Sequence, residues 1–169
     1  MFMYSLVYVS LEIHPMTDSD LVDILTIARG KNLTLDITGL LLYRGGFFMQ
    51  LLEGPEDAVD ALYERVRRDE RHSDVLLIYK ENIVEREFPG WSMGFSTIDH
   101  TINRLEGFTD FIHSPSPYFF LGQASKAKKL LHTFRVQHPF CNMMPGSSTT
   151  PESAARQLME TAELKGAVL

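Results

Sequence analysis

The sequence predicts an α+β fold of the ferredoxin-like type, with a βαββαββ order of elements, one sheet and two helices on one of its faces. Two apolar runs meet at Gly45-Gly46, and one amphipathic helical pattern lies on either side of them. Further β-rich apolar runs precede the first helix and follow the second. The 169 residues are 44% hydrophobic and 22% charged, which is typical of a globular chain with a sizeable core.

The first strand and the first helix are predicted over residues 3–10 and from Thr17 to Gly30. Residues 3–10 are apolar on both alternations, which indicates a central strand covered on both faces. Thr17 and Asp20 have the spacing of a capping box, and Gly30 is expected to end the helix. The helix's apolar face contains Leu21, Ile24, Leu25 and Ala28.

A hairpin and a second helix follow. Gly45-Gly46 tolerates positive φ and suits a tight turn, so the second and third strands should be antiparallel neighbours. Pro55 and the acidic pair Glu56-Asp57 mark the start of the second helix. Its apolar stripe contains Val59, Leu62, Tyr63 and Val66.

The rest of the chain is predicted to contain two more strands and then helices. Residues 74–84 and 91–98 are the expected fourth and fifth strands. Beyond them we expect a short helix within 102–112, a helix within 122–137, a linker over 138–152 and a last helix from Pro151. This divides the chain into a domain over 1–98 and a helical extension over 99–169. The extension should cover the second apolar face of the sheet.

Composition narrows the classes of function. The formal net charge of −6 argues against a nucleic-acid partner. Cys141 is the single cysteine, so no internal disulfide is possible, and the histidines have no usual metal-site spacing. We find no basic leader and no apolar segment long enough for a bilayer, and expect a cytoplasmic protein without a membrane partner.

One buried strand contains a residue that needs an explanation. Gln50 lies in the middle of "FFMQLLEG", where an amide costs free energy unless its donors and acceptor are paired. In the expected sheet the first and third strands lie side by side and parallel, with Tyr8 and Gln50 at their middles. The simplest interpretation is a Tyr8–Gln50 hydrogen bond that satisfies two core groups. One such bond leaves the remaining hydrogen-bond donors or acceptor of the amide for water or a ligand.

Polar residues at the ends of the two predicted helices converge on the same place. Asn32 follows the first helix, and Asp69, Arg71 and His72 follow the second. Each alone is interpreted most simply as a solvated loop residue. Together they flank a groove with Tyr8 and Gln50 at its floor, which suits a flat polar ring wedged between the helices. Trp91 is an oxidisable side chain on a late strand, although packing is its simpler interpretation.

Four separated motifs carry a resemblance to a known family. They are "LVYVS", "DITGLLLYRGGFFMQLLEG", "VRRDERH" and "FPGWSMGF", in order from about Met3 to about Ile98. In these motifs the chain resembles the BLUF domain, a blue-light sensor module that uses flavin. The resemblance implies a short stand-alone photoreceptor rather than an enzyme.

The same resemblance implies a noncovalently bound flavin, usually FAD, with FMN and riboflavin as alternatives. Asn32 would hydrogen-bond the carbonyl and imide edge of the ring, Ile24 and Val66 would cover its faces, and Phe48 would lie at the floor. Five residues would contact the ribityl chain, the phosphates or the nearby ring edge: Lys31, Arg65, Asp69, Arg71 and His72. Ala28 stands where some members have a hydroxyl residue, which removes one hydrogen bond.

By this likeness Tyr8 gives an electron and a proton to the excited flavin. Gln50 then rearranges its amide before the electron and the proton return to Tyr8. Only the hydrogen-bond pattern changes, which shifts flavin absorption to the red. Trp91 and Met93 are the candidates that relay the change. We expect a homo-oligomer and an unidentified downstream signalling protein, contacted by the C-terminal helices or the fifth strand.

Two other functions fit parts of the pattern. Acylphosphatases share the split βαβ plan, but they hold phosphate with an arginine after the first strand, and "LEIHPMTDSD" contains none. A light-independent interaction module would have an empty groove and a purely structural Tyr8–Gln50 pair. A flavin absorption spectrum separates the three readings.

Overall fold

The computed structural model describes residues 2–97, 125–136 and 150–165, and the chain divides into two compact units. The first unit contains all five strands and two helices. They follow the order β1 (Met3–Glu12), α1 (Asp18–Thr34), β2 (Thr38–Arg44), β3 (Phe47–Pro55), α2 (Glu56–Arg67), β4 (His72–Ile83) and β5 (Gly94–Thr97). The second unit contains α3 (Lys126–Val136) and α4 (Pro151–Lys165). The α+β prediction with a five-stranded sheet is confirmed.

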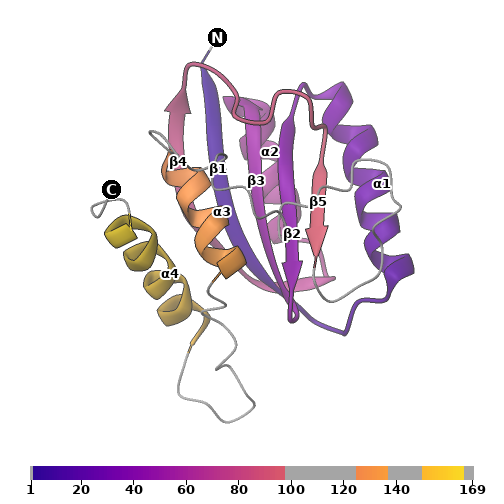
Figure 1. Cartoon of the computed structure of the whole chain (residues 1–169). Helices are drawn as coiled ribbons and strands as arrows, with labels where there is room; N and C mark the ends of the chain where they lie inside the picture. The colour runs from indigo at the N-terminus through magenta and orange to yellow at the C-terminus, as the bar shows by residue number, and fades with distance from the viewer. Residues whose placement is uncertain (1, 98–124, 137–149, 166–169) are drawn as a thin grey trace. The chain divides into compact units, whose positions relative to one another are not determined.

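The sheet has the strand order β4-β1-β3-β2-β5 (Figure 1). β3 is antiparallel to both β1 and β2, β4 is antiparallel to β1, and only the pair β2 and β5 is parallel. The predicted parallel pairing of the first and third strands is therefore wrong. Because the α1 crossover returns β2 in the direction of β1, the following hairpin must reverse β3 against both.

Helix α1 begins at the predicted capping box but continues beyond its predicted end. The Asp20 amide donates to Thr17 Oγ1 over 3.2 Å, and the Thr17 amide donates to Asp20 Oδ2 over 2.9 Å. The helix then passes through Gly30 and closes where the amide of Leu35 donates to the carbonyls of Lys31 and Asn32. The expected stop at Gly30 is wrong because glycine weakens a helix without breaking it. Asn32 consequently lies inside the last turn.

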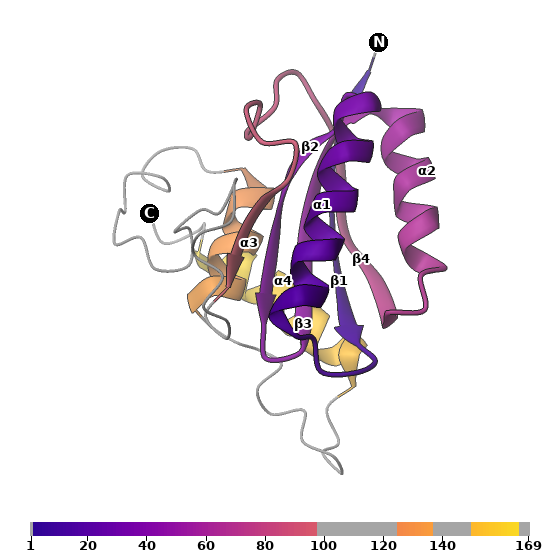
Figure 2. The ribbon, with the colours of Figure 1, turned by 90° about the vertical axis from the view of Figure 1, so that its right-hand side faces the viewer.

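The hairpin and α2 follow the predicted pattern. Gly45 and Gly46 have φ values of 56° and 81°, the left-handed conformation expected of this turn. α2 begins directly after Pro55. Figure 2 shows α1 and α2 side by side on one face of the sheet. Between this face and the helices lies a core that includes Leu6, Leu21, Leu25, Leu52, Val59 and Phe95.

The later part of the chain differs from the prediction at one strand. β5 begins at Gly94, so Trp91 and Met93 precede the strand on which they were expected. The Trp91 carbonyl accepts the amide of Gly39 on β2 over 2.8 Å, which fixes this stretch beside the sheet without strand pairing.

The second unit contains the two C-terminal helices that the sequence predicted, and α3 and α4 pack against each other. The predicted helix within 102–112 and nearly all of the 138–152 linker lie outside the described residues. That the C-terminal helices cover the second face of the sheet, and that the domain boundary lies at 98/99, stay predictions. Among the helices that the structure describes, none is long and apolar enough to cross a bilayer.

Candidate functional site

A pocket opens between α1 and α2, and the sheet forms its floor. Every residue that the sequence assigned to cofactor binding lines this pocket, and so does Tyr8. Tyr8, Phe48 and Gln50 form the floor on the sheet, while the walls come from α1, α2, the turn after α2 and His72 at the start of β4. Ile27, Leu41 and Leu62 also line it and were not predicted. Of these three, only Leu62 belongs to a predicted apolar stripe, and nothing in an apolar periodicity separates a ligand wall from a helix contact.

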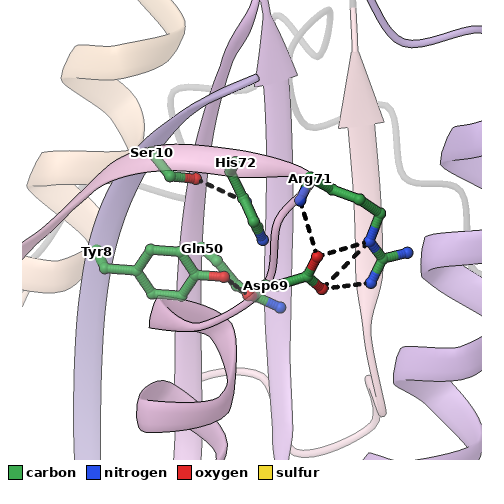
Figure 3. Close-up of polar contacts among 6 residues, drawn as sticks. All are labelled: Tyr8, Ser10, Gln50, Asp69, Arg71 and His72. Atoms are coloured by element: carbon green, nitrogen blue, oxygen red, sulfur yellow. Dashed lines mark hydrogen bonds and ion pairs between the residues drawn. The ribbon is translucent and has the colours of Figure 1, made fainter. Parts of the chain in front are cut away.

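Tyr8 and Gln50 lie directly opposite each other on β1 and β3. The Tyr8 hydroxyl donates to Gln50 Oε1 (Figure 3). Gln50 Nε2 donates to Met93 Sδ over 3.2 Å. Burial raises the pKa of Tyr8 well above its ordinary value, so the phenol is neutral and available as a donor. Both ends of the amide therefore have a partner, and the two partners come from different parts of the chain.

Asn32 presents an unused acceptor to the pocket. Its Nδ2 donates to the Ser92 carbonyl over 2.9 Å, which fixes the amide's orientation. Its Oδ1 is buried and has no hydrogen-bond partner among the residues that the structure describes. An unpaired buried acceptor costs about 1–3 kcal/mol, which a ligand N–H donor would recover.

The turn after α2 supplies charge at one side of the pocket. Arg71 Nη2 donates to Asp69 Oδ2 over 2.5 Å, and its Nε donates to Oδ1 over 2.9 Å (Figure 3). The arginine's hydrogen bonds lower the pKa of Asp69 to about 2, so the carboxyl is ionised at neutral pH. The pair raises the pKa of Arg71 in turn. Lys31 and Arg65 add two further cationic side chains to the lining.

His72 is held as part of the pocket wall. Its Nδ1 lies 3.1 Å from Ser10 Oγ, and its ring meets the Phe48 ring edge-on with 5.6 Å between centroids. Burial lowers the pKa of His72, which keeps the imidazole neutral at pH 7. The wall here is therefore polar but uncharged.

The two predicted relay residues have different surroundings. Met93 is buried against Gln50, whereas the Trp91 ring stacks on Phe88 at 5.1 Å. Besides the Asn32 contact, Arg29 Nε donates to the Met93 carbonyl over 3.0 Å. The pocket is thus joined to the stretch before β5 by the amides of Gln50 and Asn32. No sequence pattern marks Arg29, a charged residue on α1, as part of this arrangement.

The arrangement suits a flat ring with polar edges and an anionic tail. The ring would lie between apolar side chains of α1 and α2, with Asn32 Oδ1 free to accept an N–H and the Tyr8–Gln50 pair below it. Cationic side chains at the wall fit phosphate or another anionic group. No group of three or more metal-ligating side chains occurs in the part of the chain that the structure describes.

Comparisons with known proteins agree with this geometry. A family model described as "BLUF: Sensors of blue-light using FAD" matches residues 3–94. The chain is 43% identical over 94 residues to photoactivated adenylate cyclase subunit beta of Euglena longa, across 55% of this chain and 11% of that protein. It thus spans about a tenth of that relative's length.

Two solved structures are similar to the chain. The dark-state structure of BlrB, a BLUF protein, is 40% identical with a TM-score of 0.55, covering 57% of this chain and 73% of that one. The structure of BlsA in its photo-activated state is 30% identical with a TM-score of 0.58, covering 79% of this chain and 95% of that one.

Proposed function

The chain belongs to the BLUF family of blue-light sensors that bind flavin, and on this premise we propose that its pocket holds FAD and that Tyr8, Gln50 and Met93 form its light switch. The observation that carries the proposal is the pair of hydrogen bonds made by Gln50, one accepted from Tyr8 and one donated to Met93. A structural glutamine would need only fixed partners. This one lies on the floor of the pocket, between an oxidisable phenol and a thioether.

The bound flavin supplies blue-light absorption and an oxidising excited state. Tyr8 would give one electron and its hydroxyl proton to the excited flavin and would later take both back, so no net oxidation would remain. While Tyr8 lacks its proton, it no longer donates to Gln50 Oε1, and the amide is free to rotate or tautomerise. After recovery the amide presents a changed donor and acceptor pattern to Tyr8, Met93 and the ring edge. A glutamate could not exchange donor for acceptor in this way.

The remaining pocket residues have distinct proposed roles. Asn32 Oδ1 accepts the imide N–H of the ring, and Ile24 and Val66 cover the ring's two faces. Phe48 closes the floor. The ribityl chain and phosphates run past the polar wall, which contains Lys31, Arg65, Asp69, Arg71 and His72. The two cations outside the Asp69–Arg71 pair favour a phosphorylated flavin over riboflavin.

The proposal is tested first by the absorption spectrum of the purified protein. We expect flavin bands that shift to the red under blue light and return in the dark, with FAD as the released cofactor on chromatography. Tyr8→Phe and Gln50→Leu should retain the cofactor and lose the shift, because each removes one partner of the switch. Tyr79→Phe is the control, since that phenol contacts Glu81 on β4 and does not line the pocket. A protein without flavin, or an unchanged photocycle in both switch variants, would contradict the proposal.

We further propose that the signal leaves through protein contacts. The domain is a photosensor, and its output is a changed association with a second copy or a downstream protein, made through the C-terminal helices or the stretch around β5. Size measurement of the full chain by light scattering in darkness and under blue light tests this. An association state that is the same in both conditions, with no partner retained differentially in a pull-down, would overturn it.

A further inference from the structure

Glu53 is a buried carboxylate on the same strand as Gln50. Its side chain is 0% exposed. The amide of Glu87 donates to Glu53 Oε1 over 3.0 Å and approaches Oε2 at 3.1 Å, and the amide of Phe88 donates to Oε2 over 3.0 Å. A charged group so deeply buried requires strong partners, and both of its partners are backbone amides of one short stretch.

That stretch, residues 87–93, connects the carboxylate to the switch. The Phe88 ring, near its start, stacks on Trp91, and Met93 at its end accepts the hydrogen bond from Gln50. The Trp91 and Ser92 carbonyls are held by β2 and α1. The 87–93 segment has no strand pairing of its own. It is held by the Gly39 amide, by the side chains of Asn32 and Arg29, and by the Gln50–Met93 contact.

Two unused donors lie beside Glu53. Ser5 on β1 and Thr38 on β2 are each directly opposite Glu53 on β3, so the three side chains share one face of the sheet. Both hydroxyls are buried and have no hydrogen-bond partner among the described residues. A hydroxyl rotates freely about its C–O bond, so both can turn a donor toward the carboxylate.

We propose that Glu53 is the positioning residue that holds the 87–93 segment, and that Ser5 and Thr38 stabilise its carboxylate when the segment is released. When the Gln50 amide rearranges, its bond to Met93 Sδ is lost and the segment has one contact fewer. Glu53 then exchanges two amide donors for two hydroxyl donors within the core. The released segment is the moving part that a partner can detect.

Trp91 allows this to be tested in the dark, because it is the chain's single tryptophan. Glu53→Gln retains the shape of the side chain but leaves only one acceptor oxygen. Its new NH₂ group would face a backbone N–H of Glu87 or Phe88, and two donors cannot pair. We expect its Trp91 emission to move to longer wavelength and acrylamide quenching to increase. Glu85→Gln is the matched control, since Glu85 is an exposed acid near the same segment. Unchanged emission and quenching in Glu53→Gln would overturn the proposal.

Dark recovery of the flavin-loaded protein tests the exchange of donors, and this part rests on the proposed function. Glu53→Gln should slow recovery about tenfold, the factor for one hydrogen bond to a charged group. Ser5→Ala/Thr38→Val should speed it about threefold, because neutral donors that favour release are lost. If the recovery rate falls in Glu53→Gln and rises in Ser5→Ala/Thr38→Val, the proposal is supported. If the two variants change the rate in the same direction, it is overturned. If the wild-type protein binds no flavin, the proposed function fails, whereas the Trp91 measurement still decides the role of Glu53.

Discussion

The side chain of Gln50 connects Tyr8 on β1 to Met93 in the 87–93 segment. Tyr8 reaches its oxygen from the opposite strand, and Met93 reaches its nitrogen from the 87–93 segment. Rotation of the amide therefore changes both contacts at once. A neutral phenol at position 8 is necessary for this, and burial, which raises the Tyr8 pKa, provides it.

Met93→Leu removes the sulfur that accepts from Gln50 while nearly preserving side-chain volume. We expect the free energy of unfolding to fall by about 1 kcal/mol more than in Met49→Leu, because Gln50 Nε2 loses its partner in the core. Met49 is equally buried but lies on the other face of β3, which makes it a matched control. Urea unfolding of both variants gives the comparison. Equal losses would mean that the Gln50–Met93 contact contributes no stability.

At the scale of elements, α1 depends on its first turn. Thr17→Ala removes the acceptor for the Asp20 amide and should lower the free energy of unfolding by about 1 kcal/mol. Thr26→Ala, in the same helix, removes an exposed hydroxyl that bonds the Val22 carbonyl and should be neutral or slightly stabilising. Thermal unfolding of the two variants measures the difference. A Thr17→Ala variant no less stable than Thr26→Ala would contradict the role of the cap.

The turn after α2 has a defined pH dependence. The pKa of Asp69 is lowered from the usual 3.8 to about 2, so its stabilising pair with Arg71 is fully present above pH 4 and is lost as pH falls toward 2. We expect Asp69→Asn to be less stable than wild type at pH 6, with the difference shrinking toward pH 2. Asp23→Asn, at an exposed site on α1, is the control for loss of a carboxylate outside the pair. Urea midpoints across this range test it, and a difference that grows on acidification would contradict it.

At the scale of the whole molecule, the sequence predicted the order of elements and the pocket better than the details of the sheet. Alternation placed Tyr8 and Gln50 at the middles of two central strands, and their register confirms that they face each other. The predicted parallel direction of the first and third strands is wrong, although the element order determines it. A crossover that returns β2 in the direction of β1, followed by a hairpin, makes β3 antiparallel to both. Asn32 lies inside α1 and not beyond it, because a glycine in the chain weakens a helix without ending it.

Glu53 is visible in the sequence as a charged residue within a buried strand. It stands three positions after Gln50 in the same apolar run, and a carboxylate there needs partners even more than an amide does. Its partners, however, are the backbone amides of Glu87 and Phe88, more than thirty residues along the chain, and no pattern of side chains predicts which backbone amides a carboxylate will meet. The same limit applies to Met93, because only the fold brings its sulfur to Gln50.

The division of the chain into two units predicts how a ligand acts on stability. Flavin in excess should raise the unfolding temperature of the unit that contains the pocket, since binding at 100 times Kd adds about 2.7 kcal/mol to the bound unit alone. Calorimetry of the full chain with and without FAD should therefore resolve a transition that moves and one that does not. A single transition that moves as a whole would show that the two units unfold together.

The passage of α1 through Gly30 has a consequence for temperature. The last turn of this helix carries Asn32, which faces the pocket and holds Ser92, and Arg29, which holds Met93, lies one turn earlier. A glycine inside a helix costs roughly 1 kcal/mol relative to alanine, so this end is the first to fray on warming. Fraying would loosen the cofactor and the switch segment in one event. We expect Gly30→Ala to raise the unfolding temperature, which thermal unfolding of the variant and the wild type would measure.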